Sequence, residues 1–170
     1  MSKKGNILVE PSHESKKGKY GLITTLWNRD IVEVLFKNAK EELLKQGVHK
    51  ENIFHLEVPG AFELPLSAKR LGKRKDIDAI IALGAIIKGE TPHFDMIANS
   101  CATGLITVSL EINKPVIFGV LTTNNYEQAL ERADSRKGNK GAEAALSAML
   151  LLENLSKISE YAFNYLTNKI

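Results

Sequence analysis

Residues 77–112 read IDAIIALGAIIKGETPHFDMIANSCATGLITVSLEI, and this stretch decides the fold. Ile77–Leu83 is an almost unbroken apolar run, typical of a strand that is buried on both faces of a parallel sheet. A polar loop from Gly84 to His93 follows it. Beyond the loop, one apolar stripe recurs at the 3.6-residue period of a helix: Phe94, Ile97, Ala98, Cys101, Leu105, Val108 and Ile112. The stretch therefore predicts a strand, a loop and a long helix.

The same alternation of strands and helices continues on both sides of this stretch. Further strands are expected at Lys19–Trp27, Ile53–Val58 and Pro115–Leu121. Helices are expected from Asp30 to Gly47, over Glu63–Leu71 and Tyr126–Ala133, and from Ala142 to Leu155. Strands that alternate with helices form right-handed βαβ units and a mainly parallel sheet. The sequence therefore predicts an α/β fold, a three-layer αβα sandwich with a central, mainly parallel, four-stranded sheet.

Two of these helices begin with recognisable capping signals. Asp30 and Glu33 have the spacing of a capping box. Thr91 can cap the long helix, with Pro92 at the first helical position. Gly47 suits the C-terminal stop of the earlier helix.

One domain accounts for the whole chain, residues 1–170. At 44% apolar and 25% charged residues, the composition is that of an ordinary globular domain. We expect a core over about residues 19–156, an N-terminal tail over 1–18 and a C-terminal extension over 157–170. Within the tail, Ile7–Val9 could pair as an extra edge strand.

Charge, cysteine and histidine content argue against several classes of function. The net charge of +3 is too small to indicate nucleic acid as a partner. The single cysteine, Cys101, fits a reducing compartment, and the four histidines are too scattered for a zinc site. No apolar run reaches the roughly 18 residues of a membrane span, and the first residues lack the apolar stretch of a signal peptide. We therefore expect a cytoplasmic protein that binds no metal, nucleic acid or membrane.

Ligands of open α/β sheets bind beyond the carboxyl ends of the strands, and unusual residues occur in those turns. Gly89, Glu90 and Thr91 lead into a helix start, where free backbone N–H groups and the helix dipole favour an anion such as phosphate. An ordinary capped helix beneath a loop explains the same residues. The pattern is neither a Walker A loop nor the dinucleotide fingerprint, so it does not indicate a nucleotide.

Three side chains in these turns are candidates for a functional role. His93, in the first turn of the long helix, could accept and return a proton, or be a structural histidine at the edge of a layer. Trp27 could stack on a ligand ring or belong to the core. Glu63 could bind a polyol or a heterocycle, or be a solvated residue of a helix start.

Two further features are weaker signals. Arg132 and the basic residues between 136 and 140 could neutralise a phosphate, or form ordinary soluble surface. Cys101 lies on the apolar stripe, so we expect a buried, inert thiol. The residues by themselves indicate a phosphate-handling α/β domain and leave open whether it is an enzyme or a binding protein.

Five longer motifs occur in order along the chain: VPGAFELP (58–65), ALGAIIKGETPHFD (82–95), FGVLT (118–122), EQALERA (127–133) and GNKGAEAA (138–145). Taken together they resemble the lumazine synthase family, with its flavodoxin-like layering. The resemblance extends from about residue 20 to 155. It implies a transferase that condenses 5-amino-6-(D-ribitylamino)uracil with 3,4-dihydroxy-2-butanone 4-phosphate. The products are 6,7-dimethyl-8-ribityllumazine, phosphate and water, in the penultimate step of riboflavin biosynthesis, with no metal or cofactor.

The resemblance also implies a role for individual residues. His93 would be the proton donor and acceptor. The butanone phosphate would be bound by Glu90, Thr91 and Arg132. The ribitylaminouracil would be bound by Trp27, Ala61, Phe62, Glu63, Ala85, Ile86, Ile87, Phe118 and Lys140.

The family's sites lie between subunits, so the resemblance implies a homopentamer in which a neighbour supplies Phe118, Arg132 and Lys140. The short loop from Asp134 to Asn139 is compatible with a 60-subunit shell of twelve pentamers, and riboflavin synthase could be a partner. Two positions depart from the family pattern. Position 27 is often Phe in the family, and Asp134 stands where the family usually has Gly, so its carboxylate could weaken phosphate binding.

Three other functions compete with this reading. A non-catalytic riboflavin-binding relative would need Trp27 and Glu63 but neither His93 nor Arg132. A shell-forming container would assemble without turnover. A flavodoxin-like electron carrier is disfavoured because the chain lacks a Ser/Thr-rich phosphate loop after the first strand.

Overall fold

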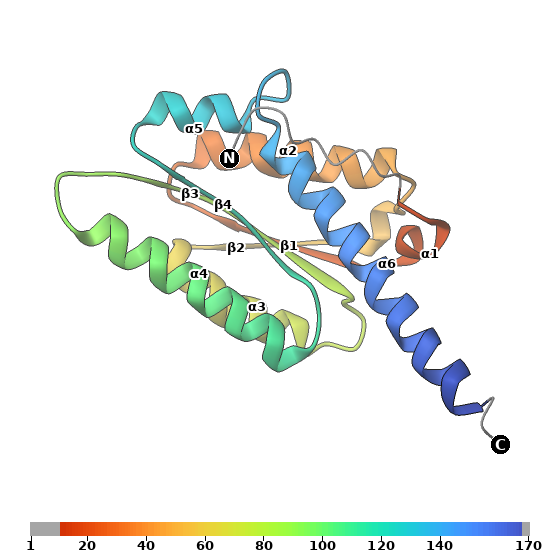
Figure 1. Cartoon of the computed structure of the whole chain (residues 1–170). Helices are drawn as coiled ribbons and strands as arrows, with labels where there is room; N and C mark the ends of the chain where they lie inside the picture. Colours follow the sequence, from red (N-terminus) through yellow and green to blue (C-terminus); the bar gives the residue numbers. More distant parts are fainter. Residues whose placement is uncertain (1–10, 168–170) are drawn as a thin grey trace.

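The chain forms a four-stranded parallel sheet between two layers of helices (Figure 1). The computed structural model describes residues 11–167, so the predicted edge strand Ile7–Val9 lies outside the described residues. The strands are β1 (Tyr20–Thr25), β2 (Ile53–Val58), β3 (Ala79–Ile87) and β4 (Val116–Thr123), in the order β2-β1-β3-β4. The predicted αβα sandwich with its parallel sheet is confirmed.

Each face of the sheet packs on its own set of helices. On one face lie α2 (Arg29–Lys45), α5 (Tyr126–Ala133) and α6 (Lys140–Thr167). On the other lie α3 (Leu64–Gly72) and α4 (His93–Ile112). Side chains alternate between the two cores along the central strand β3, where Ile81 faces the first set and Ile80 and Ala82 the second.

Strand β3 is longer than its sequence indicates. The expected strand ends at Leu83, whereas the observed one continues to Ile87. Its last four residues pair with β4, from Gly84 opposite Val120 to Ile87 opposite Thr123. Because β4 itself reaches Thr123, it supplies backbone partners for Gly84–Ile87, a segment that is expected to follow the strand as a turn.

Two expected helix caps are wrong. Helix α2 begins at Arg29, because Asn28 turns the chain in a left-handed conformation with φ of 55°, and the Asp30–Glu33 capping box does not form. Helix α4 begins at His93 with Pro92 as its N-cap residue, so Thr91 does not cap it. The C-terminal stop of α2 is confirmed, since Gly47 adopts φ of 97° directly after the helix.

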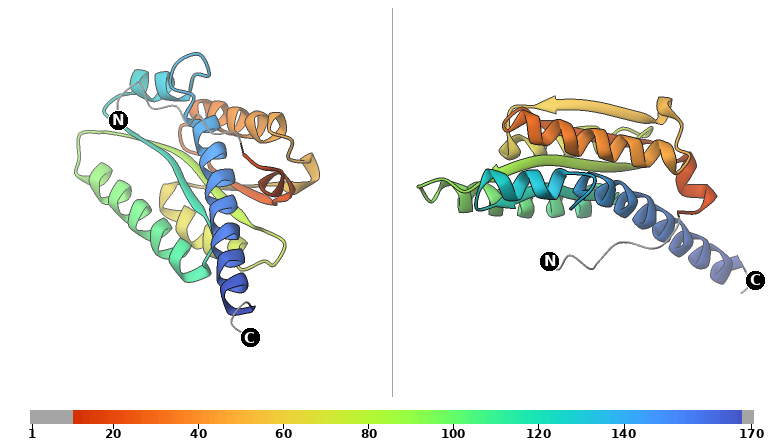
Figure 2. Two further views of the ribbon diagram at one scale, coloured as in Figure 1. Left: turned by 45° about the vertical axis from the view of Figure 1, so that its right-hand side comes forward. Right: turned by 90° about the horizontal axis from the view of Figure 1, so that it is seen from above.

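Both ends of the described chain are more helical than expected. Part of the predicted tail forms α1 (His13–Lys17), which packs against α6. The Ser12 N–H donates to Glu153 Oε2 over 2.8 Å, and the Tyr20 hydroxyl donates to the Ser15 carbonyl over 2.6 Å. Helix α6 continues to Thr167 and projects beyond the sheet (Figure 2), because no Gly or Pro interrupts residues 142–167.

Two structural features are absent from residues 11–167. Within this range, no helix is both long and apolar enough to cross a membrane. Within the same range, no group of three His, Cys, Asp or Glu residues is arranged to hold a metal ion.

Candidate active site

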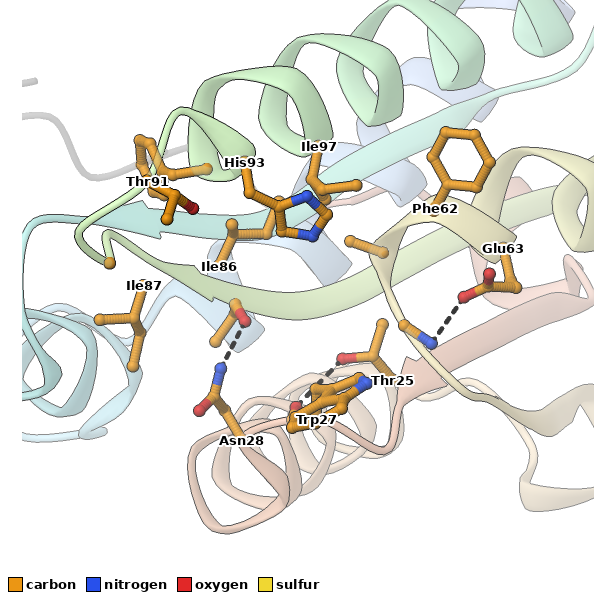
Figure 3. A pocket seen from close by; sticks show the side chains of 15 residues that line it. Thr25, Trp27, Asn28, Phe62, Glu63, Ile86, Ile87, Thr91, His93 and Ile97 are labelled. Atoms are coloured by element: carbon orange, nitrogen blue, oxygen red, sulfur yellow. Dashed lines mark hydrogen bonds between the residues drawn. The ribbon is translucent and has the colours of Figure 1, made fainter.

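A pocket of about 690 Å³ opens at the carboxyl ends of β1, β2 and β3, beside the start of α4 (Figure 3). This is where ligands bind in open α/β sheets. Nine of the thirteen residues named above as candidate site residues line it: Trp27, Ala61, Phe62, Glu63, Ala85, Ile86, Ile87, Thr91 and His93. The fold therefore brings together residues that are spread over more than sixty positions of the sequence.

Trp27 forms one wall of the pocket and is 75% exposed, so it does not belong to the core. Its position follows from the backbone, which continues the pairing of β1 with β2 beyond the strands. The Leu26 N–H donates to the Val58 carbonyl over 2.9 Å, and the Trp27 N–H to the Pro59 carbonyl over 3.3 Å. A Cβ atom at Gly60 would lie 3.3 Å from Trp27 Cδ1, so the indole packs directly on this glycine. An indole that packs on Gly60 and is otherwise exposed can stack on a planar ligand.

Glu63 lies in a 3₁₀ turn over Ala61–Glu63, which follows β2 and precedes α3. Its Oε2 atom accepts a hydrogen bond of 2.8 Å from the Gly60 N–H (Figure 3). The side chain is exposed and close to the exposed ring of Phe62. The carboxylate is thus fixed by one oxygen and faces solvent at the rim, where it can accept hydrogen bonds from a polar ligand.

The floor of the pocket is the end of β3. Ala85 and Ile86 are buried, and Ile87 is half-buried where the strand ends. The Ala85 carbonyl accepts a hydrogen bond of 2.8 Å from Asn28 Nδ2. Since these residues belong to a paired strand, the backbone at the floor is rigid rather than a mobile loop.

His93 projects from the first turn of α4 over Ile86, on the opposite wall from Trp27 (Figure 3). It is exposed, as are Gly89, Glu90 and Thr91 in the turn that leads into the helix. Gly89 and Thr91 line the pocket, whereas Glu90 does not. No side chain among the described residues caps α4, so the first N–H groups of this helix have no side-chain acceptor.

Besides Glu90, three candidate residues do not line this pocket within the same chain. Phe118 is on edge strand β4 and is 41% exposed. Arg132 is in the last turn of α5 and is exposed, and Lys140 begins α6, where its ammonium contacts the Glu143 carboxylate. Among residues 11–167 of a single chain, no arginine therefore lines the pocket.

Asp134, one departure from the family pattern, needs no glycine conformation, because its φ is −57°. Its Oδ1 atom accepts the Arg136 N–H over 2.9 Å. This backbone hydrogen bond, together with the Arg136 guanidinium, lowers the pKa of the Asp134 carboxyl. The carboxylate thus forms a hydrogen bond within its own loop, the turn between α5 and α6.

Five lining residues were missed by the sequence reasoning: Thr25, Asn28, Gly60, Phe94 and Ile97. Phe94 and Ile97 belong to the predicted core stripe of α4 and do pack against the core, but they also line the pocket. Asn28 could have been found, since an Asn directly after a strand is one of the few residues that tolerate a left-handed turn. The Cys101 prediction is confirmed, because the thiol is fully buried and burial raises its pKa to about 11.

Comparison with known proteins identifies the family. The family model for 6,7-dimethyl-8-ribityllumazine synthase matches residues 17–156. The chain belongs to this family. A lumazine synthase of Cytophaga hutchinsonii is 51% identical over 133 residues, which are 78% of this chain and 84% of the relative. The lumazine synthase match ends at residue 156, so the last turns of α6 lie beyond it.

Proposed function

We propose that this pocket is where the chain condenses 5-amino-6-(D-ribitylamino)uracil with 3,4-dihydroxy-2-butanone 4-phosphate. The products are 6,7-dimethyl-8-ribityllumazine, phosphate and water. Membership of the lumazine synthase family makes the chain a transferase of riboflavin biosynthesis. The observation that supports this location is the meeting of an exposed indole, a rim carboxylate and a helix-start histidine around one pocket.

The ribitylaminouracil occupies the side of the pocket formed by Trp27. Its pyrimidine ring stacks on the exposed indole. Phe62 and Glu63 hold the ring edge and the ribityl chain. The free carboxylate oxygen of Glu63 accepts hydrogen bonds from hydroxyl groups of the ribityl chain. Backbone groups of residues 85–87 contribute further hydrogen bonds at the floor.

The butanone phosphate occupies the side at the start of α4. The positive end of the helix dipole and the uncapped N–H groups attract its phosphate. Glu90 and Thr91 form the turn around it. A phosphate is best neutralised by an arginine, and Arg132 of a neighbouring subunit supplies that charge, since the chain's own Arg132 lies outside the pocket.

The reaction needs no activated nucleophile from the protein, because the substrate amine attacks the ketone. Loss of water gives a Schiff base, elimination releases phosphate, and the ring then closes with loss of a second water. Orienting the two substrates supplies much of the acceleration. His93 faces both subsites and acts as the proton donor and acceptor of these steps.

A homopentamer completes the site by bringing Phe118, Arg132 and Lys140 of one subunit to the pocket of the next. Exposed apolar side chains support self-association, since Met96 and Leu110 on α4 are 66% and 76% exposed. Twelve pentamers would form a 60-subunit shell that could enclose riboflavin synthase. The single unpaired cysteine supports a cytoplasmic location.

Turnover of the two substrates tests the activity, followed by lumazine absorbance against the spontaneous rate. We expect turnover above that rate in the native chain and a strong decrease in Arg132→Ala. No excess over the protein-free control would overturn the proposal.

Co-expression of two variants tests whether the site is shared. A subunit carrying Arg132→Ala has an intact His93, and a His93→Ala neighbour has an intact Arg132, so mixed pentamers regain complete sites. We expect mixed assemblies to exceed the average activity of the separate variants. Activity equal to that average would place Arg132 in the same chain's site or outside any site.

A further inference from the structure

We propose that Asn28 is a positioning residue that sets the place of the Trp27 indole and so determines affinity for the ring substrate. This inference rests on the proposed function, because it gives Trp27 the role of a stacking platform. It concerns a residue that lines the pocket but contacts the protein itself with its side-chain nitrogen.

The backbone changes direction at Asn28, directly after Trp27. Up to Trp27 the chain is extended beside Val58 and Pro59, and at Asn28 it turns with φ of 55° and ψ of 45°. The Asn28 carbonyl then accepts the N–H groups of Ile31 and Val32, both over 3.1 Å, and α2 begins. Asn28 thus connects the extended segment that carries Trp27 to helix α2.

The side chain of Asn28 does not make the capping hydrogen bond that is usual for an Asn at the start of a helix. An Asn at the N-cap normally accepts a backbone N–H of its own helix through its side-chain oxygen. Here no such bond forms, and Nδ2 donates to the Ala85 carbonyl over 2.8 Å instead (Figure 3). This hydrogen bond ties the turn after β1 to the floor of the pocket on β3.

The hydrogen bond matters because the restraints on Trp27 itself are weak. Trp27 is 75% exposed and packs on Gly60, its N–H donates to the Pro59 carbonyl over 3.3 Å, and its carbonyl accepts from the Thr25 hydroxyl over 3.4 Å. The shorter Asn28 bond, at 2.8 Å, adds a further point of attachment one residue along the chain. It also uses one of the two lone pairs of the Ala85 carbonyl oxygen.

Two substitutions separate the contribution of the left-handed turn from that of the hydrogen bond to Ala85. Asn28→Gly keeps a left-handed turn, which glycine adopts freely, but removes the amide. Asn28→Asp keeps the size and tolerates the turn, but places a carboxylate oxygen against the Ala85 carbonyl. The matched control is Asn113→Gly, because Asn113 has the same left-handed conformation, φ of 52°, at the opposite end of α4 from the pocket.

The experiment measures substrate kinetics and the fluorescence of Trp27, which is the only tryptophan of the chain. For Asn28→Gly we expect the KM of ribitylaminouracil to rise roughly threefold to tenfold, as for the loss of one hydrogen bond, with little change in the KM of the butanone phosphate. Asn28→Asp should raise it further. In both variants the fluorescence anisotropy of Trp27 should decrease, whereas Asn113→Gly should match the native chain in kinetics and anisotropy.

An equal rise of both KM values, or an anisotropy that stays at the native value in both Asn28 variants, would overturn the inference. The anisotropy is measured without substrates. If the native chain forms no lumazine, the proposed function fails, while the anisotropy still decides whether Asn28 positions Trp27. Should Asn28→Gly not fold, the Asn28→Asp variant gives the same readouts.

Discussion

Replacement of Gly141 by alanine tests the contact between α6 and α2. A Cβ atom at this position would lie 2.2 Å from the Leu35 carbonyl oxygen and 3.1 Å from the Ala39 nitrogen. Both are backbone atoms of α2, so no side-chain rotation can relieve the clash. Helix α6 must move away by about 1 Å to reach an ordinary contact distance of about 3.5 Å.

The expected cost follows from two opposing terms. Overpacking against a fixed neighbour costs up to about 3 kcal/mol. The higher helix propensity of alanine returns about 1 kcal/mol. The net loss in the free energy of unfolding is therefore about 2 kcal/mol, which corresponds to a decrease of roughly 4–8 °C in melting temperature for a domain of this size.

Thermal unfolding followed by circular dichroism measures this change. The protein concentration must be equal for all variants, because assembly raises apparent stability. The control is Gly89→Ala, since a Cβ atom there meets nothing within 4 Å. A Gly141→Ala variant that melts together with the native chain and the control would refute the close packing of α6 on α2.

Three further outcomes are expected. His93→Ala should slow turnover by at most about 10²–10⁴-fold, and Arg132→Ala should reduce it more; a complete loss in His93→Ala alone would reverse this order. Lys157 and the Ser12 N–H hold the pKa of Glu153 at about 2, below the usual 4.5 of a glutamate. Its ionised form therefore stabilises the fold above about pH 4.5, and this contribution is lost as the pH falls toward 2. Urea unfolding at pH 5 and pH 3 should thus differ less in Glu153→Gln than in the native chain. Cys101, buried with a pKa of about 11, should react with a thiol reagent at pH 8 only after denaturation, and labelling of the folded protein would contradict its burial.

The fold class could be predicted from the sequence because it depends on local patterns. The apolar run at 77–83 and the stripe along α4 each report burial within one segment, and both are confirmed by the two cores. The ends of the elements could not be predicted as well. The end of β3 at Ile87 depends on pairing with β4, which is about thirty residues away in sequence.

The composition of the site was partly predictable for a similar reason. His93, Thr91 and Glu63 occur in turns whose place beyond the strands follows from the fold class. The local sequence gives Trp27 two readings, core or site, and the exposed indole decides between them. Asn28 gains its role from a hydrogen bond to Ala85, 57 residues later, for which no local pattern exists.

The sequence by itself determined the order of strands and helices, the family and the set of candidate residues, because these follow from residue types and short spacings. The tertiary structure decided which candidates meet. It placed Trp27, Glu63 and His93 around one pocket and left Arg132 outside it. The physical reason is that packing and strand pairing join segments remote in sequence, so distances across the pocket are properties of the folded sheet.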